Sequence, residues 1–298
     1  MTAVYLIISY IVLSSAISKF ASLSLQGSSS NVQLLFFPAL VFVFLTDVLI
    51  AGLFTTLNIP VLRVAAVGTV HLVFAVLLFC LIHCLHRGAL QKPAEKDVRD
   101  FLGYIVIVGV AVACGFAQFG MSLNLNFSST DPATHFANTL AVLDSGRVEG
   151  MYFTYYITSL VIEALQSFTG IYGTYKIFII AEIGYYALDA CVFYSLLRII
   201  DNKCATSLCV TVLYMLGYPL NNMVFGFSYL GVGTTLFLTF TFMWTAFWRT
   251  CSCIKLLLIS LIFIFGCAVC YSLFAPVIAL SLALLSAARF RTFVSGHK

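Results

Sequence analysis

The chain has 298 residues, of which 62% are hydrophobic and 9% are charged, whereas roughly 25% of residues are charged in soluble proteins. A mean hydropathy of +1.07 excludes a water-soluble fold, and because the apolar runs are far longer than the strands of a membrane barrel, they predict an all-α, polytopic integral membrane protein. The net charge of +4 comes from basic residues at segment ends, which indicates an orientation in the lipid bilayer and excludes a nucleic-acid-binding patch.

Four apolar segments come first, and each is long enough to cross a hydrocarbon core of about 30 Å as a helix. They cover residues 3–25, 33–57, 63–85 and 102–123. The loop at residues 86–100 carries four Lys or Arg residues, which predicts a cytoplasmic position. Counting back over three spans places the N-terminus outside, and the fourth span then leads to an external loop.

This external loop, residues 124–150, contains one predicted helix. Asp131 followed by Pro132 is a strong helix start, with the aspartate as N-cap and the proline at the first helical position. The helix is expected to end at Gly146 and to lie in the membrane plane, with His135 one turn after Asp131. Three apolar residues would lie along one side of it: Phe136, Leu140 and Leu143.

The next segment, residues 151–168, combines apolar positions with Thr, Ser, Glu and Gln at helical spacing, which is typical of an interfacial helix. Spans at residues 171–200, 204–219 and 228–248 would follow. If residues 151–168 do not cross, Arg198 and Lys203 lie inside, as the positive-inside rule favours. The run at residues 254–288 amounts to two further crossings, so about nine spans are expected, with the C-terminus inside. The chain then divides into a four-helix transmembrane segment (1–123), an external loop with two amphipathic helices (124–170) and C-terminal transmembrane helices (171–298).

Several short motifs occur in a fixed order along the second half of the chain. Residues 130–136 read Thr-Asp-Pro-Ala-Thr-His-Phe, residues 145–147 read Ser-Gly-Arg, and a Tyr-rich stretch begins the second helix. A long span ending in an Arg follows, then Tyr218-Pro219 in an expected loop and the stretch Tyr-Ser-Leu-Phe-Ala-Pro at 271–276. From about residue 124 to 290 this arrangement resembles the GT-C glycosyltransferases. Those are multi-span enzymes that move a sugar from a polyprenyl-phosphate carrier to an acceptor at the outer face of the membrane, with an acidic residue of this loop in the active site.

Glycosyl transfer from a lipid phosphate needs a carboxylate that takes the proton of the acceptor hydroxyl or holds a divalent cation. By the resemblance, Asp131 has this catalytic role, and His135 would orient the acceptor or share the metal. The alternative is that Asp131 only caps its helix, where hydrogen bonds from backbone N–H groups would make it a poor base.

Four further residues are expected to bind the substrate. The departing phosphate needs a cation, and Arg147 in the loop and Lys176 near the outer end of the next span are the nearest ones along the chain. Tyr152 and Tyr155 stand at the aromatic start of the second helix.

Inside the membrane, Asp47, Glu182 and Asp189 are costly to bury and are functional candidates for that reason. Glu182 and Asp189 lie seven residues apart, so they share one helix face and could line a polar cavity or a proton path. The structural alternative is that these carboxyl groups hydrogen-bond neighbouring helices or nearby tyrosines.

The sequence thus favours a membrane glycosyltransferase that uses a polyprenyl-phosphate-linked sugar, acts on an envelope or surface glycan or a protein acceptor, and lies in a bacterial plasma membrane. A transporter or flippase with a path lined by the three intramembrane carboxyl groups is the second hypothesis. A non-catalytic membrane subunit or fragment is the third.

Overall fold

The computed structural model describes most of the chain. The described residues exclude 1, 25–31, 86–94, 125–126, 128–129, 149–153, 171–172, 202, 249–250 and 296–298. Every regular element within them is a helix, which confirms the all-α fold expected from the composition.

The helices follow the apolar segments of the sequence. The first part of the chain forms α1 (Thr2–Ser24), the short 3-10 helix η1 (Val32–Leu35), α2 (Phe36–Thr56), α3 (Val64–Leu85) and α4 (Glu95–Phe119). The external loop forms α5 (Asp131–Ser145), and α6 (Thr154–Thr169) follows it. The last part forms α7 (Thr174–Ile200), α8 (Cys204–Met215), α9 (Tyr218–Phe225), α10 (Ser228–Phe247), α11 (Cys253–Cys270) and α12 (Phe274–Ser295).

Seven helical segments of the described residues are long and apolar enough to cross a membrane: α1, η1 with α2, α3, α4, α7, α8 with α9, and α10. Two shorter apolar helices, Ile254–Cys270 and Phe274–Ala288, lie in the run where the sequence predicts a final pair of crossings. Phe74 of α3 and Phe101 of α4 are 57% and 56% exposed. Because such apolar surface is stable against lipid and unstable against water, the chain is an integral membrane protein.

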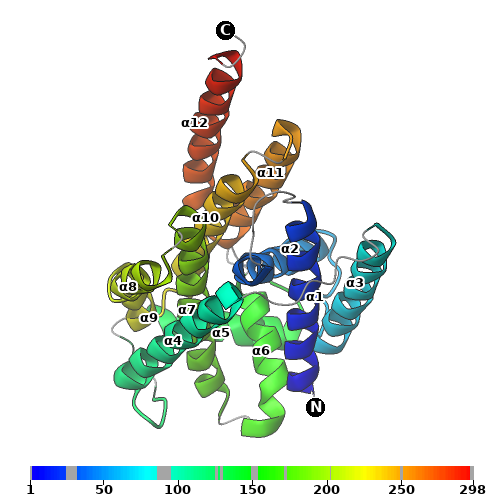
Figure 1. Cartoon of the computed structure of the whole chain (residues 1–298). Coiled ribbons are helices and arrows are strands. Elements are labelled where there is room, and N and C mark those ends of the chain that lie inside the picture. The colour runs from blue at the N-terminus through cyan, green and yellow to red at the C-terminus, as the bar shows by residue number, and fades with distance from the viewer. Residues whose placement is uncertain are drawn as a thin grey trace.

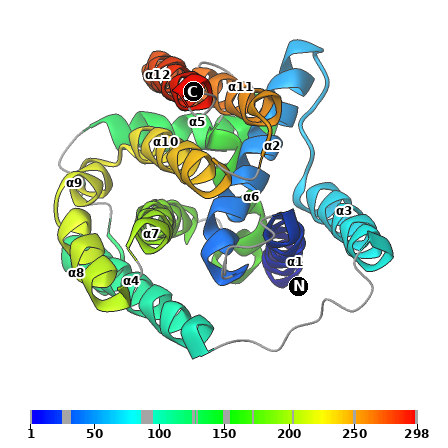
Figure 2. The same cartoon turned by 45° about the horizontal axis from the view of Figure 1, so that its top comes forward.

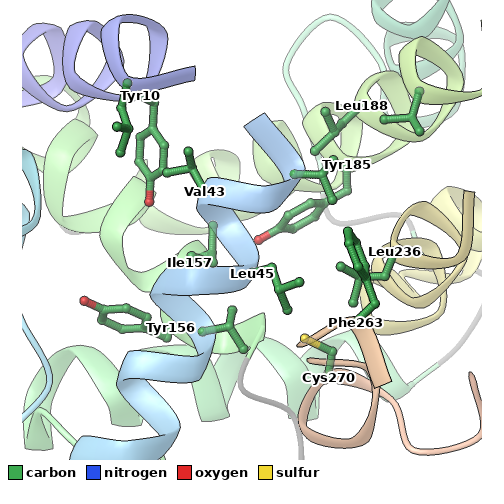
Figure 3. Close-up of a cluster of buried hydrophobic side chains, with 14 of the residues drawn as sticks. Tyr10, Val43, Leu45, Tyr156, Ile157, Tyr185, Leu188, Leu236, Phe263 and Cys270 are labelled. Carbon is green, nitrogen blue, oxygen red and sulfur yellow. The ribbon is translucent and has the colours of Figure 1, made fainter. Parts of the chain in front are cut away.

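Helix α7 is the central element of the arrangement. Figure 2 shows it with α4, α8 and α9 on one side and with α10 and α2 on the other. Buried side chains of α1, α2, α6, α7 and α11 pack together around α2 (Figure 3): Tyr10, Leu45, Tyr156, Tyr185 and Phe263. A second buried cluster joins α4, α7 and α8 through Tyr104, Ile107, Tyr194 and Met215.

Contacts at the two ends of the molecule agree with the orientation expected from charge. At one end, Arg198 Nε donates a hydrogen bond to Asp100 Oδ1 at 2.6 Å, so the start of α4 and the end of α7 lie on the same side. At the other end, the loop between α2 and α3 joins the external loop, because the Val61 N–H donates to the Gly146 carbonyl at 2.8 Å. Figure 1 shows α1 beginning beside the end of α6, while α12 projects at the opposite end of the molecule.

Helix α6 differs from the interfacial helix expected from its sequence. Its polar residues Thr158 and Ser159 are buried, whereas the amphipathic pattern was expected to expose them to water. The Thr158 hydroxyl bonds to the Tyr185 hydroxyl at 2.9 Å, and the Ser159 hydroxyl donates to the Tyr156 carbonyl at 2.7 Å. Since these hydroxyl groups find partners inside the protein, their burial carries little cost. Helix α6 is therefore packed beneath α5, against α1, α2 and α7.

Candidate functional site

Helix α5 begins with the Asp-Pro pair and ends where the sequence predicts. Thr130, and not Asp131, is the N-cap residue, and Asp131 occupies the first turn. An acidic side chain in the first turn is favourable because of the helix dipole, and the Asp131 side chain is exposed. Gly146 ends the helix in the left-handed conformation, with φ of +67°, which a residue without Cβ adopts at no cost. Asp131 is therefore the first residue of the helix, one position after the N-cap position expected for it.

The buried face of α5 is turned toward His135. Pro132, His135, Thr139 and Val142 are buried, whereas the three apolar residues expected to form the packed side are half-buried: Phe136, Leu140 and Leu143. Gly226, in the turn that precedes α10, lies directly against the Pro132 ring. This contact keeps the Pro132 side of α5 packed against the protein. His135 consequently points into the protein, and Asp131 lies at the edge of the same region.

His135 is held by a short network from α6. Its Nδ1 bonds to the Tyr155 hydroxyl at 2.6 Å, and the Asn138 side-chain N–H group donates to the same hydroxyl at 3.5 Å. The Tyr155 hydroxyl thus fixes the position of the imidazole through Nδ1, and the tautomer of the ring sets which of the two groups donates. Tyr155, which is predicted to bind substrate, is 4% exposed and contacts His135 through its hydroxyl.

The electrostatic environment keeps His135 neutral. Burial lowers the pKa of His135 from its ordinary value, and the negative charge of Asp131 opposes part of that shift. A neutral imidazole at neutral pH can exchange hydrogen bonds with hydroxyl groups without adding charge to a partly apolar site.

An aromatic wall covers the other side of the imidazole. The ring of Tyr229 lies 4.8 Å from that of His135, and the ring of Tyr271 lies 5.2 Å from that of Tyr229. Tyr229 comes from the start of α10, and Tyr271 comes from the turn between α11 and α12. Three chain segments that are far apart in the sequence, around residues 131–138, 226–229 and 271, thus meet at one place.

The predicted cations lie at different distances from this place. Arg147 is exposed and follows α5, whose 15 residues separate it from Asp131 by roughly 22 Å at 1.5 Å per residue. Lys176 is in the first turn of α7, and its ammonium lies 6.0 Å from the centre of the neighbouring Tyr175 ring. Two positions later, the ring of Phe178 lies 5.3 Å from that of Phe136, but residues two apart point to different sides of a helix, so this contact does not bring the Lys176 side chain to α5. Tyr152 lies outside the described residues.

Sequence analysis did not single out Arg63, which joins the outer elements. Its guanidinium donates to the Leu143 carbonyl at 2.6 Å and lies 3.9 Å from the Glu163 carboxylate. The first contact satisfies a carbonyl at the C-terminal end of α5, where a cation is also favoured by the helix dipole. The sequence signal for this role is limited to one basic residue, Arg63 itself, at the start of the third apolar run.

The divalent cation implied by the resemblance has few ligands at the site. Within the residues that the structure describes, no three His, Cys, Asp or Glu side chains are grouped closely enough to hold a metal ion. His135 Nδ1 is already bonded to Tyr155, which leaves Asp131 and one ring nitrogen. This donor set does not fit a resident divalent cation.

Asp47 belongs to a separate buried network. The Tyr10 hydroxyl donates to Asp47 Oδ2 at 2.5 Å, and His71 Nε2 bonds to Asp47 Oδ1 at 3.0 Å. The Ser9 hydroxyl lies 3.5 Å from the other ring nitrogen of His71. Since this network ties α1, α2 and α3 together, the structural interpretation of Asp47 is the better supported one.

Glu182 and Asp189 line a different cavity, between α7, α9 and the start of α10. Asp189 accepts hydrogen bonds from the Tyr214 hydroxyl at 2.7 Å and the Thr235 hydroxyl at 3.0 Å. Glu182 shares a side-chain hydrogen bond with Ser228. The two carboxyl groups therefore face one polar space, and Asp47 lies elsewhere.

Comparison with known proteins adds no relative to this description. The scan against protein-family models gives no match, and searches of curated proteins and of solved structures find no similar protein. The functional assignment therefore depends on the residues and on their geometry.

Proposed function

We propose that the chain is a membrane glycosyltransferase that moves a sugar from a polyprenyl-phosphate carrier to an acceptor at the outer face of a bacterial plasma membrane. One observation carries the proposal. The segment around Asp131 and the turn before α12 contain two of the motifs on which the GT-C resemblance rests, and the turn before α10 joins them through Pro132, Gly226, Tyr229 and Tyr271.

The side chains at this place suit a sugar acceptor or donor. The carboxylate of Asp131 is exposed and can accept the proton of an acceptor hydroxyl as the new glycosidic bond forms. His135 is a positioning residue, since Tyr155 holds its imidazole one helical turn from Asp131. Tyrosine rings such as those of Tyr229 and Tyr271 combine an apolar face with a polar edge, and sugar rings need both.

The phosphate that leaves needs a cation close to Asp131. Arg147 is separated from Asp131 by the length of α5, so Lys176, in the first turn of α7, is the cation assigned to the phosphate. In the proposed reaction the bond from sugar carbon to phosphate oxygen breaks, the acceptor oxygen bonds to that carbon, Asp131 takes the acceptor proton, and Lys176 stabilises the phosphate charge.

The test is transfer of radiolabelled sugar from polyprenyl-phosphate donors in membranes that contain the wild-type chain or a variant. Asp131→Asn should lower transfer at least 100-fold, because general-base catalysis of this kind contributes about 10²–10⁴-fold. Asp144→Asn changes another exposed carboxylate of α5 and should retain activity. Wild-type transfer that Asp131→Asn leaves intact would reject the proposed role.

A transporter is the second candidate function, and the cavity beside α7 favours it. That cavity lies in a membrane span, holds two carboxyl groups and is bounded by the interrupted helix pair α8 and α9, an arrangement found in transporters. Glu182→Gln and Asp189→Asn should then abolish transport while Asp131→Asn preserves it, which is the reverse of the pattern expected for sugar transfer.

A further inference from the structure

The cavity beside α7 is small and lies between three helical elements, and several polar side chains line it. Glu182, Tyr186 and Asp189 line it from α7, Asn222 lines it from α9, and Ser228 lines it from the first turn of α10. The centre of a water-sized sphere can occupy about 10 Å³ of it, which is enough for about one water molecule or one small ion.

Asn222 is a buried polar residue of this cavity whose side-chain amide forms no hydrogen bond with the protein. Its side chain is 4% exposed, and neither its amide oxygen nor its amide nitrogen has a hydrogen-bond partner. Burial of an amide group without partners costs about 1–3 kcal/mol. A buried asparagine that lines a cavity beside two carboxyl groups therefore points to a ligand that the amide oxygen can contact.

The charges around the cavity indicate a cation. Glu182 and Asp189 both face it, and the three ion pairs of the described residues involve other acidic residues. The two hydroxyl donors of Asp189 offset its charge, whereas Glu182 shares one hydrogen bond with Ser228. Glu182 is thus the carboxylate with the larger unmet need for positive charge.

We propose that the Glu182 carboxylate, the Asn222 amide oxygen and the Ser228 hydroxyl bind one Na⁺ ion inside the membrane. Oxygen donors suit a hard cation. A single positive charge neutralises Glu182, while the hydroxyl groups of Tyr214 and Thr235 stabilise the charge of Asp189. The space admits an ion of the size of Na⁺, and the interruption of the span at Gly217, between α8 and α9, brings Asn222 to the cavity.

Purified full-length protein in detergent provides the test, with choline as the replacement cation. Bound ²²Na⁺ should saturate at one ion per chain, and the melting temperature should rise with Na⁺ concentration, since an ion that binds only the folded state stabilises it. Asn222→Ala and Glu182→Gln should reduce Na⁺ affinity at least 10-fold and flatten the dependence of melting temperature on Na⁺. Asn221→Ala, at the exposed neighbouring position, should bind like the wild type.

The result that overturns the proposal is a wild-type chain that neither binds ²²Na⁺ nor melts differently in NaCl and choline chloride; the cavity then holds water. Glu182→Gln preserves side-chain size, so it tests the site even if Asn222→Ala fails to fold. A Glu182→Gln variant that binds Na⁺ with wild-type affinity would equally reject the assignment. Sugar transfer is measured separately, so the outcome at Asp131 does not affect this one.

Discussion

At the scale of single residues, the environment of His135 predicts a pH-dependent contribution to stability. Burial holds the pKa of His135 below its ordinary value, so protonation favours the unfolded chain. The contribution is fully present above about pH 6.5 and is lost as the pH falls through that value toward the lower pKa of the folded state. The loss can reach about 1.4 kcal/mol per pH unit.

Melting temperatures between pH 8 and pH 5 check this expectation when the wild type is compared with His135→Gln. The difference between the two proteins should shrink as the medium becomes acidic, because only the wild type has the imidazole. The other histidines of the chain are the same in both proteins, so they do not affect the difference. Parallel curves of melting temperature against pH would mean that burial does not lower the pKa of His135.

Single residues also show which parts of the candidate site the sequence predicts and which parts it does not. Asp131-Pro132 and Gly146 mark the bounds of α5 to within one residue, because helix starts and ends depend on local chemistry. Asn222, Tyr229 and Tyr271 were not singled out as site residues. Their roles depend on which turns pack together, and a single sequence does not contain that information.

At the scale of elements, close packing of α5 on the turn before α10 depends on Gly226. A Cβ atom there would collide with the Pro132 ring, and the residue has φ of +71°. Gly226→Ala should therefore destabilise the protein by about 1–3 kcal/mol and weaken sugar transfer, because it pushes the start of α5 away from α10.

Gly120→Ala is the matched control for this variant. Gly120 has φ of +70° and has open space around its Cβ position, so its substitution adds the same backbone strain without the collision. Denaturation midpoints and transfer rates of the two variants can be compared directly. Equal losses in both would show that strain alone, and not the contact with Pro132, explains the effect.

Elements were predicted best where one physical requirement dominates. Long apolar runs must form helices to satisfy their backbone in lipid, and the spans follow them. The short helix α9 was expected as a loop at Tyr218-Pro219, yet proline is accepted in the first turn of a helix. Helix α6 was placed at the water interface because its polar stripe can face water or protein, and periodicity does not distinguish the two.

At the scale of the whole molecule, one ion pair connects the charge pattern with the architecture. Asp100 and Arg198 are 98 positions apart and both are buried, and Tyr194 also donates a hydrogen bond to Asp100 at 3.1 Å. The basic loop and the end of α7 are therefore on one side, and α5 with the loop between α2 and α3 is on the other. The start of α1 and the end of α12 lie at opposite ends of the molecule (Figure 1). The chain therefore crosses the membrane an odd number of times between them.

This topology predicts the accessibility of engineered cysteines. In a background without the native exposed cysteines, Ala137→Cys on the exposed side of α5 should react with a membrane-impermeant maleimide in intact cells. Lys203→Cys, at the exposed turn before α8, should react only after permeabilisation, because positive charge favours the cytoplasmic side. The reverse pattern would place Asp131 on the cytoplasmic side, where an acceptor at the outer face cannot reach it, and sugar transfer at the outer surface would then be rejected together with the orientation.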